Sequence, residues 1–521
     1  MTDGAFRVAG QVPVAIVGAG PTGITAATLL AQLGVQTLIL DRWPDVYPQP
    51  RAVHLDDEIY RILARLGIAD EFATISRPTR GLRLLDNRFK VLAEFNRDPS
   101  CSVHGFPQAN MFDQPELEVL LRANLKRYPN ARLRSDTEVT AVTEHEGHVR
   151  VTFTDRSDGR VHHVDADYVL GCDGANSLVR ARIGSAMRDL NFEQRWLVVD
   201  VATSQTRGAD LRQWEGVHQV CDPVRAGTYM RIGQARYRWE FRLLPGESAD
   251  DFGTLSALRP LIAPWTGDVP DSDLTLLRVT EYTFRAQIAD RWRRDNVFIL
   301  GDAAHLTPPF IGQGMGAGVR DAMNLSWKIA GVLNGTLAAD VLDSYEQERK
   351  PHTRSMIRLA LNVGQSMTGG GWLGNLARRV VLPRLRWVPG LRDKVVDSTT
   401  PALNRSALVC KSRRSRRLAG TLCPNPPLPG GQRLDALLGN GFALVTSEPL
   451  GTADHALLRR HGVVVLVAEQ GSELEKWLRR GRAAGAIVRP DRTVMCAGRD
   501  IAALCGRLDL APLQLRDNPE R

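Results

Sequence analysis

The chain is 521 residues long, carries a formal net charge of +9, and is 43% apolar and 24% charged. This length exceeds what a single hydrophobic core supports, so we expect an ordinary globular protein of several domains. The longest apolar runs have only the length of strands, which argues against a membrane-spanning helix. The positive charge is spread along the chain, and its densest run, residues 411–417, has no interleaved aromatic side chains, which argues against a nucleic-acid partner.

The cysteines and the first residues favour a cytoplasmic protein. Seven cysteines are scattered along the chain without a CxxC pair or a metal-like spacing of His and Cys, as expected for reduced thiols. Residues 1–13 lack the basic start and apolar core of a secretory signal. We therefore predict a cytoplasmic protein without a metal site.

Residues 14–40 are predicted to form a strand, a glycine-rich turn, a helix and a second strand. Gly18, Gly20 and Gly23 stand at the GxGxxG spacing of a dinucleotide-binding turn. The first glycine permits the tight turn, the second lets a pyrophosphate approach the backbone, and the third lets the helix pack on the strand. The helix N-terminus offers N–H groups to phosphates, and Asp41 can accept a hydrogen bond from a ribose hydroxyl.

The next part of the chain predicts helices, a meander and a second turn. Apolar periodicity indicates helices at 56–66 and 114–127, and residues 136–170 alternate like the strands of a β-meander. The last of these strands leads into Asp173 at an Asp-Gly turn and then into a helix start that carries Arg180. Such an arrangement can bring a charged group back toward a pyrophosphate.

Residues 190–285 read as strands broken by turns and predict a mostly antiparallel sheet. An apolar strand at 297–300 then runs into a Gly-Asp pair and a loop rich in glycine and proline. Asp302 can accept a hydrogen bond from a ribityl hydroxyl, and the loop over residues 308–316 has little bulk, so a planar ring can lie against its backbone. The positive end of the following helix would stabilise negative charge on that ring, as a reduced flavin needs. The cofactor indicated is FAD.

These three segments, in this order and at this spacing, resemble the GxGxxG, DG and GD motifs of the class A flavoprotein monooxygenases. The members of this family are aromatic hydroxylases that share the para-hydroxybenzoate hydroxylase fold, and the resemblance covers residues 1–395. Residues 47–58, 221–225, 239–247 and 312–314 are most similar to the branch of the family that hydroxylates 3-(3-hydroxyphenyl)propionate.

The resemblance implies an α/β fold with a Rossmann-like FAD-binding domain, an inserted, mostly antiparallel β-sheet substrate domain and a C-terminal thioredoxin-like α/β domain. The FAD-binding domain would comprise residues 1–190, including the meander, and residues 286–395. The substrate-binding sheet would lie between them at 191–285. A linker at 396–419 would lead to the thioredoxin-like domain at 420–521, which resembles that of the phenol hydroxylase branch.

The resemblance also implies which residues bind FAD. They lie in the three motifs, in the glycine-rich loop and on the helices beside them. The expected cofactor-binding residues are Gly18, Gly20, Pro21, Thr22, Gly23, Asp41, Arg42, Arg51, Gln114, Asp173, Asp302, Pro308, Gly312, Gln313, Gly314, Met315 and Asn324.

In this family NADH or NADPH reduces FAD, and the reduced flavin reacts with O2 to give a C4a-hydroperoxide that hydroxylates a phenol ring, usually ortho to the existing hydroxyl. The chain has no second unit in which an apolar strand runs into a GxGxxG turn, so the nicotinamide co-substrate is expected to bind transiently, with Arg42 and Arg51 available to its phosphates. We expect a small aromatic substrate, no nucleic acid and no membrane span, and we leave a homodimer open.

A base near the substrate hydroxyl would speed the reaction, because a phenolate reacts faster with an electrophile. The candidate catalytic residues are His54, at the end of a Pro-Arg-Ala segment, and Tyr282, on a late strand of the sheet. For an acidic substrate side chain, Arg225, Arg231 or Arg238 can bind a carboxylate bidentately.

Two alternative functions remain open at this point. One is a tailoring hydroxylase that acts on a larger polycyclic aromatic of the polyketide type. The other is a flavin-dependent halogenase or a lipid reductase on the same fold, although the Trp-x-Trp-x-Ile-Pro segment of the halogenases is absent.

Overall fold

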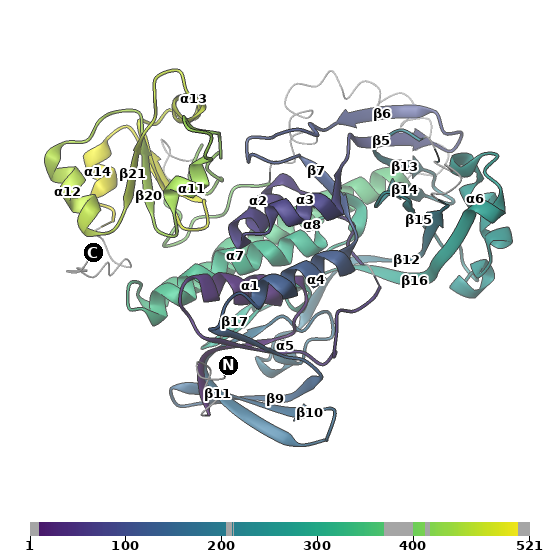
Figure 1. Ribbon diagram of the computed structural model, residues 1–521, viewed down its shortest axis with the longest axis horizontal. Helices are drawn as coiled ribbons and strands as arrows, with labels where there is room; N and C mark the ends of the chain where they lie inside the picture. Colours follow the sequence, from purple (N-terminus) through teal and green to yellow (C-terminus); the bar gives the residue numbers. More distant parts are fainter. Residues whose placement is uncertain are drawn as a thin grey trace.

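The computed structural model describes residues 10–49, 51–204, 211, 213–368, 400–411 and 417–508. Two sheets of eight strands, one of four and one of three organise these residues. Figure 1 shows the four-stranded C-terminal sheet at one end of the molecule, the second eight-stranded sheet at the opposite end, and the first sheet below a central layer of helices. Among the described residues, no helix is both long and apolar enough to cross a membrane.

The first sheet is mostly parallel and carries the three predicted motifs. Its order is β17-β18-β11-β1-β2-β8, with the antiparallel meander strands β10 and β9 attached at β11. Its strands are β1 (Gln11–Val17), β2 (Thr37–Leu40), β8 (Ala131–Arg134), β9 (Thr137–His145), β10 (His148–Asp155), β11 (Val161–Gly171), β17 (Arg293–Arg294) and β18 (Val297–Ile299). β1, β11 and β18 are parallel neighbours, so the segments that follow them meet at one edge of the sheet.

Helices cover this sheet and connect its strands. They are α1 (Pro21–Gln32), α2 (Asp57–Leu66), α3 (Ala69–Ile75), α4 (Gln114–Leu125), α5 (Leu178–Arg182), α7 (Gly314–Leu333) and α8 (Ser344–Thr368). The helices predicted at 56–66 and 114–127 are present as α2 and α4. Asp56 caps α2 by accepting a hydrogen bond from the Ile59 N–H at 2.9 Å, and Gly67 ends it in the left-handed conformation.

The second sheet is mostly antiparallel, as predicted, in the order β19-β16-β12-β15-β14-β13-β5-β6. Its strands are β5 (Gly81–Asp86), β6 (Val91–Asn96), β12 (Met187–Thr203), β13 (Val217–Cys221), β14 (Gly227–Arg231), β15 (Arg236–Arg242), β16 (Leu274–Ala289) and β19 (His305–Leu306). The range predicted for the substrate domain, 191–285, therefore supplies the middle of this sheet, while both edges come from elsewhere in the chain. The helix α6 (Leu255–Thr266) packs its apolar side chains on one face of the sheet.

A small sheet, β3-β7-β4, links the two larger ones through the segment between α1 and α4. Its strands are β3 (His54–Asp56), β4 (Ser76–Pro78) and β7 (Ala109–Phe112). Short 3-10 helices are η2 (Ala249–Phe252), η3 (Asp271–Asp273), η4 (Gly301–Ala303), η5 (Pro309–Ile311) and η6 (Ala339–Asp343). Of these, η4 and η5 form the Gly-Asp turn and the glycine-rich loop.

The C-terminal region forms a mixed four-stranded sheet in the order β21-β20-β22-β23. Its elements are β20 (Ala443–Thr446), β21 (Val464–Val467), β22 (Gly485–Val488), β23 (Val494–Gly498), α11 (Leu434–Leu438), α12 (Thr452–Arg460), α13 (Glu473–Arg480) and α14 (Ile501–Cys505). It packs on the central helices, where Trp327 of α7 meets Phe442 edge-on. Residues 396–399 and 412–416 of the predicted linker lie outside the described residues.

Candidate active site

The GxGxxG turn is built so that only glycine fits at two of its three positions. Gly18 has φ +101°, and a Cβ there would lie 2.4 Å from the Cys172 carbonyl oxygen of the second motif. A Cβ on Gly23 would lie 2.0 Å from the Gly18 carbonyl oxygen, so the helix packs closely on the turn. Gly20 differs, because a Cβ there would meet nothing within 4 Å. Open space therefore lies beside the N-terminus of α1, where no side chain caps the backbone N–H groups.

Asp41 holds the turn from the end of β2. Its carboxylate accepts hydrogen bonds from the Ala19 N–H at 2.5 Å and the Trp43 N–H at 2.8 Å. Each carboxylate oxygen thus receives one backbone donor and keeps a lone pair for a further partner. The side chain is nearly buried, which fixes the carboxylate in place beside the glycine turn.

The first and third motifs are in direct contact. A Cβ on Gly318, in the first turns of α7, would lie 2.2 Å from the Thr22 hydroxyl and 3.0 Å from the Gly301 Cα. Gly301 itself has φ +60°, and a Cβ there would lie 2.8 Å from the same hydroxyl. Pro21 occupies the first turn of α1 beside this contact. Segments nearly 300 residues apart in the sequence are thus brought together by three small residues.

Asp302 follows this contact and its carboxyl is open to solvent. Enough protein surrounds the group that desolvation raises the pKa of Asp302, although His305 and Arg51 oppose the shift. An accessible carboxyl is available to hydrogen-bond a polyol hydroxyl. The ribityl contact expected from the sequence stays a prediction.

A buried ion network holds the Gly-Asp turn from beneath, and the sequence analysis missed its centre, Asp321. This carboxylate accepts from the Gly301 N–H at 3.1 Å, lies 2.7 Å from His305 Nε2, and accepts from Arg349 Nε at 2.8 Å. Burial alone would raise the pKa of Asp321, but His305 and Arg349 outweigh burial and lower it. His305 is completely buried and packs under the loop.

The second motif braces the other two. Asp173 accepts from the Ser177 hydroxyl at 2.6 Å and the Val179 N–H at 3.1 Å, so its carboxylate organises the start of α5. Arg180 donates to the Ala303 carbonyl oxygen at 3.0 Å, which ties the second motif to the third. The charged group predicted to return toward a pyrophosphate is therefore held at the edge of the Gly-Asp turn.

The glycine-rich loop is fixed by contacts on several sides. Gly312 has φ +63°, and a Cβ there would lie 2.8 Å from His54 Nδ1. Gln313 is buried and donates to Asp56 Oδ2 at 2.8 Å, while the Phe310 carbonyl oxygen accepts from Gln219 Nε2 at 3.0 Å. The side chain of Gln313 thus faces the protein, which leaves the loop backbone as the surface for a ligand.

The remaining loop residues predicted to bind FAD surround the start of α7. Pro308 is buried, Gly314 is the first residue of the helix, and Met315 is half-buried against the main core. A Cβ on Gly314 would have no neighbour closer than 3.9 Å, and no side chain caps the helix. The positive end of α7 is therefore open, as a ring with developing negative charge requires.

Gln114 and Arg51 lie together on the side of the site nearest β2. Gln114 Oε1 accepts from the Arg51 N–H at 3.1 Å and the Ala52 N–H at 2.6 Å, so it positions the segment before His54. The Arg51 guanidinium lies 5.1 Å from the centre of the Tyr47 ring, and its positive charge acts to lower the pKa of Asp302. Both Arg51 and Arg42 are exposed.

The two predicted bases, His54 and Tyr282, lie in different sheets on either side of the glycine-rich loop. His54 lies on β3 behind the glycine-rich loop, and burial lowers its pKa, so the ring is neutral at pH 7. Tyr282 lies on β16 directly opposite Trp196 on the neighbouring strand, and its hydroxyl accepts a hydrogen bond from Arg278. Only Tyr282 is therefore on the face of the second sheet that contacts the loop through Phe310.

The side chain of Asn324 forms its hydrogen bonds in a different part of the structure. Its amide donates to Glu348 Oε2 at 2.8 Å and its carbonyl oxygen accepts from Lys328 Nζ at 2.8 Å, in a buried network next to the C-terminal domain. These contacts use both ends of the amide. The predicted contact between Asn324 and FAD gains no support from them.

The three arginines proposed for a substrate carboxylate are already paired. Arg225 binds both carboxylate oxygens of Glu247, at 2.9 and 2.5 Å. Arg238 binds both oxygens of the buried Asp200, at 2.7 and 2.9 Å. Arg231 lies 3.4 Å from a Glu215 carboxylate oxygen. None of the three is therefore held ready for a substrate carboxylate in this arrangement.

The second sheet contributes residues that the sequence analysis did not single out. Asp200 lies directly opposite Arg238 on one neighbouring strand and Arg278 on the other. Glu240 lies two residues further along β15, on the same face, because side chains alternate along a strand. Glu240 is half-buried, and its carboxylate has no hydrogen-bond partner among the described residues. Burial raises its pKa, Arg238 opposes this shift, and Asp200 adds to it.

Aromatic side chains share this face and meet the loop. Trp196 is 1% exposed and its ring lies 5.7 Å from that of Phe310 and 6.0 Å from that of Phe284. The face thus combines an apolar part near the loop with a polar part around Asp200. Strand alternation in the sequence could have identified which residues share this face, but not that it is turned toward the loop.

An FAD molecule fits the residues at this edge of the first sheet. Open space beside Gly20 and the uncapped start of α1 suit a pyrophosphate, Asp41 suits a ribose and Asp302 suits a ribityl chain. The uncapped start of α7 suits the ring. The individual contacts between these residues and FAD stay predictions.

Comparisons with known proteins agree with this geometry. Residues 11–360 match the FAD binding domain family. A 3-(3-hydroxy-phenyl)propionate/3-hydroxycinnamic acid hydroxylase of Burkholderia cenocepacia (strain HI2424) is 33% identical over 95% of this chain and 95% of its own length. The hydroxylase of the same name from Escherichia coli O81 (strain ED1a) is 29% identical over 93% of this chain and 91% of its own length.

Solved structures share the fold over nearly the whole chain. The complex of aklavinone-11 hydroxylase with FAD and aklavinone has a TM-score of 0.78 and 26% identity, and covers 97% of this chain and 99% of its own. The flavin-dependent monooxygenase PieE, with FAD and substrate, has a TM-score of 0.77 at 23% identity over the same shares and supports the fold alone. The chain therefore belongs to the FAD binding domain family and is an FAD-dependent aromatic monooxygenase.

Proposed function

We propose that this enzyme uses NADH or NADPH and O2 to hydroxylate a phenolic acid of the 3-(3-hydroxyphenyl)propionate class, ortho to the existing hydroxyl. The names of the relatives that span the whole chain support this substrate class. The observation that carries the proposal is the face of the second sheet opposite the glycine-rich loop. It presents aromatic side chains next to a cluster of charged side chains, which suits a flat ring with polar substituents.

FAD, when bound, supplies the redox chemistry that activates O2, and the protein supplies orientation, exclusion of water and local charge. Asp302, Asp41 and the turn around Gly20 would hold the cofactor. The backbone of the loop near Gly312 would lie against its ring. Trp196 and Phe310 would keep the reacting ring away from water, because they are almost completely buried.

The substrate hydroxyl needs a hydrogen-bond acceptor that can take up its proton. Tyr282 is one candidate. Arg278 donates one hydrogen bond to the Tyr282 hydroxyl, and this hydroxyl can form a further hydrogen bond with the substrate hydroxyl. Glu240 is another, because its raised pKa brings the carboxylate closer to the range where a general base is effective. His54 supports the loop through Gly312 and would act on the substrate only from behind it.

The guanidinium of Arg278 is the best placed group for an acidic substituent of the substrate. Its side chain is 8% exposed and lies 4.0 Å from Asp200, whose carboxylate is already bound by Arg238. Arg238 and Arg278 thus both lie beside the one carboxylate of Asp200, so a substrate carboxylate beside Arg278 would be attracted by the positive charge of this pair. A carboxylate there would orient the ring relative to the loop.

A larger polycyclic aromatic is the alternative substrate. The structural similarity to aklavinone-11 hydroxylase, at 26% identity over nearly the full length of both chains, favours this alternative. The two substrate classes differ in the volume they need beside Phe310 and in the charge they carry. A halogenase or reductase on the same fold is a more remote alternative.

We also propose that the C-terminal region is a thioredoxin-like domain with a structural role. Its four-stranded mixed sheet supports the comparison, and burial raises the pKa of Cys423 to about 12, so this thiol stays protonated at neutral pH. The boundaries at 190, 285, 395 and 420 belong to the same proposal. A cytoplasmic location and a homodimer would be consistent with this arrangement.

Steady-state oxidation of NADH and NADPH by the purified, FAD-loaded chain tests the function. We expect 3-(3-hydroxyphenyl)propionate to stimulate oxidation strongly and to be converted to the catechol, as measured by mass spectrometry of the product. Stimulation by a polycyclic phenol and not by the phenylpropanoid would favour the alternative. A chain that cannot be loaded with FAD would overturn both.

A further inference from the structure

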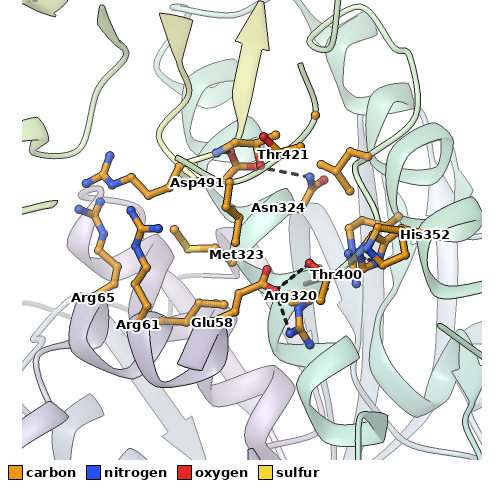
Figure 2. Close-up of a pocket in the computed structure, with 18 of the residues that line it drawn as sticks. Glu58, Arg61, Arg65, Arg320, Met323, Asn324, His352, Thr400, Thr421 and Asp491 are labelled. Carbon is orange, nitrogen blue, oxygen red and sulfur yellow. Dashed lines mark hydrogen bonds and ion pairs between the residues drawn. The ribbon is translucent and has the colours of Figure 1, made fainter. Parts of the chain in front are cut away.

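A cavity lies between the FAD-binding region and the C-terminal domain, outside the site described above. It has a volume of about 70 Å³ and is lined by residues of α2, α7, α8 and the C-terminal domain. Figure 2 shows Arg61 and Arg65 reaching from α2 toward the C-terminal domain, while Arg320 and Asn324 enter from α7. A buried water needs roughly 10–15 Å³ of such space, so the cavity has room for about five waters or one small oxyanion.

Positive charge exceeds negative charge on the walls of this cavity. Five arginines line it against three carboxylates, but Arg320 and Arg349 are also bound by Asp56 and Asp321 behind the wall. The uneven charge therefore lies where Arg61, Arg65 and Arg492 surround the single carboxylate of Asp435, which leaves an excess of two positive charges there. The ring of His352 also faces the cavity, and burial together with Arg349 and Arg320 holds its pKa well below the usual value, so this ring is neutral. The arginines are Arg61, Arg65, Arg320, Arg349 and Arg492.

The three carboxylates on the walls already have partners. Asp435 accepts from Arg61 Nε at 2.6 Å and Nη2 at 2.7 Å, and from Arg492 Nε at 2.8 Å. Glu58 lies 2.8 Å from Arg320. Asp491, the third acid, forms an ion pair with Arg489 behind the wall. None of these acids is thus available to balance a further guanidinium.

Two adjacent arginines keep donors that no described residue accepts. Arg65 Nη1 donates to the Gly439 carbonyl oxygen at 3.0 Å, but its Nε is buried without a partner. Arg492 is 4% exposed, and its Nη1 is likewise buried without a partner. Burial and the charge of Arg492 lower the pKa of Arg65 to about 10, and burial also lowers the pKa of Arg492. Buried donors left unpaired on two neighbouring cations are costly unless an acceptor joins them.

We propose that this cavity binds a phosphate-class oxyanion between Arg65 of α2 and Arg492 of the C-terminal domain. Such a group carries acceptors only, matches the fork of guanidinium donors, and as a dianion balances the excess of two positive charges. The phosphate is either free in solution or the terminal group of a larger molecule. Because the two arginines come from different domains, the bound anion holds the C-terminal domain on α2.

The test uses the full-length, FAD-loaded protein. Thermal unfolding and calorimetric titration are followed with inorganic phosphate at constant ionic strength, maintained with chloride. Parallel titrations with NADP+ and NAD+ distinguish a carried phosphate from a free one, since neither nucleotide can reduce the flavin. The variants are Arg65→Gln and Arg492→Gln, and the matched control is Arg127→Gln, whose side chain is 60% exposed in a surface ion pair with Glu71.

We expect inorganic phosphate to raise the melting temperature of the wild type and of Arg127→Gln, and to bind Arg65→Gln about tenfold more weakly, as expected for a lost charged hydrogen bond. A rise with NADP+ alone that disappears in Arg65→Gln would identify a carried phosphate as the ligand. The proposal is overturned if neither compound raises the melting temperature, or if both variants respond like the wild type. Should Arg492→Gln fail to fold, Arg65→Gln decides, because its one described hydrogen bond goes to a backbone carbonyl.

Discussion

Gly318 and Thr22 are in contact at the point where the first and third motifs meet: a Cβ on Gly318 would lie 2.2 Å from the Thr22 hydroxyl. The added Cβ would also lie 3.0 Å from the Gly301 Cα, so rotation of the Thr22 side chain alone cannot make room for it. The contact sets the spacing between α1 and α7, the two helices whose uncapped N-termini we propose to face FAD.

Gly318→Ala is therefore expected to weaken FAD binding and to destabilise the protein. Overpacking of this kind costs about 1–3 kcal/mol, because the two helix starts must separate. Fluorimetric titration of the apoprotein with FAD and thermal unfolding measure the two effects. Gly253→Ala is the matched control, since its Cβ would have no neighbour closer than 3.6 Å. Equal FAD affinity in Gly318→Ala and the control would contradict the role assigned to this contact.

Asp302→Asn is expected to reduce FAD retention. The carboxyl is accessible and its pKa is raised, so the group can serve a ribityl hydroxyl, whereas the amide offers a weaker acceptor. We expect about tenfold weaker binding, as for a lost hydrogen bond to a charged group. The flavin-to-protein absorbance ratio after gel filtration measures it, with the exposed Asp340→Asn as control. Retention like that of the control would remove Asp302 from the cofactor site.

Tyr282→Phe and His54→Gln should separate the two predicted bases. The Tyr282 hydroxyl is bound by Arg278 on the sheet face, so its loss should lower kcat for hydroxylation by about 10²-fold or more if it is the base. His54 lies against Gly312, so its replacement should mainly weaken FAD binding. Single-turnover product formation and FAD titration give the two readouts. A large loss of kcat with normal FAD affinity in His54→Gln would reverse this assignment.

Glu240→Gln tests the carboxyl that faces the substrate side of the sheet. Because burial raises the pKa of Glu240, its ionised form is lost already when the pH falls through a value above that of an ordinary glutamate. We expect the acidic limb of the kcat/KM profile to move or disappear in the variant. Glu281→Gln serves as control, because both oxygens of its carboxylate on β16 are bound by Arg195 of the adjacent strand β12. An unchanged profile would mean that Glu240 does not act on the substrate.

Asp57 predicts a pH dependence of stability. Burial and the neighbouring charge of Asp56 raise the pKa of Asp57 to about 7, above the unfolded value, so the folded state binds more protons between these two values. Stability contributed by the protonated carboxyl is thus present at acidic pH and is lost as the pH rises toward 7. Relative to the wild type, Asp57→Asn should gain about 2 kcal/mol of unfolding free energy between pH 5 and pH 8.

Urea unfolding at the two pH values measures this difference. The exposed Asp45→Asn is the control and should change stability equally at both pH values. A difference between Asp57→Asn and wild type that does not grow with pH would show that the carboxyl ionises normally.

Local sequence patterns were sufficient for the parts of the fold that local physics decides. The GxGxxG turn was predictable because Gly18 needs a positive φ and Gly23 a close approach to the backbone, and both requirements act within a few residues. The bounds of α2 followed from Asp56 as its cap and Gly67 as its end. The mostly antiparallel character of the second sheet followed from strand-like stretches that are broken by turns.

Contacts between distant segments could not be derived in this way. Asp321 holds the Gly-Asp turn from α7, but nothing in its immediate sequence distinguishes it from a surface aspartate. The family resemblance predicts a contact between Asn324 and FAD, and this contact stays a prediction. The resemblance gave no sign that the Asn324 amide is hydrogen-bonded to Glu348 and Lys328.

The sequence by itself determined the cofactor class and the positions of the three motifs, because each motif is a strand followed by a turn whose residues are constrained by their own backbone. Only the tertiary structure decided which side chains face one another across those turns. Strand register places Asp200 between Arg238 and Arg278, and domain packing brings Arg65 beside Arg492. Such pairings depend on the free energy of packing whole elements together, which no short segment of the chain contains.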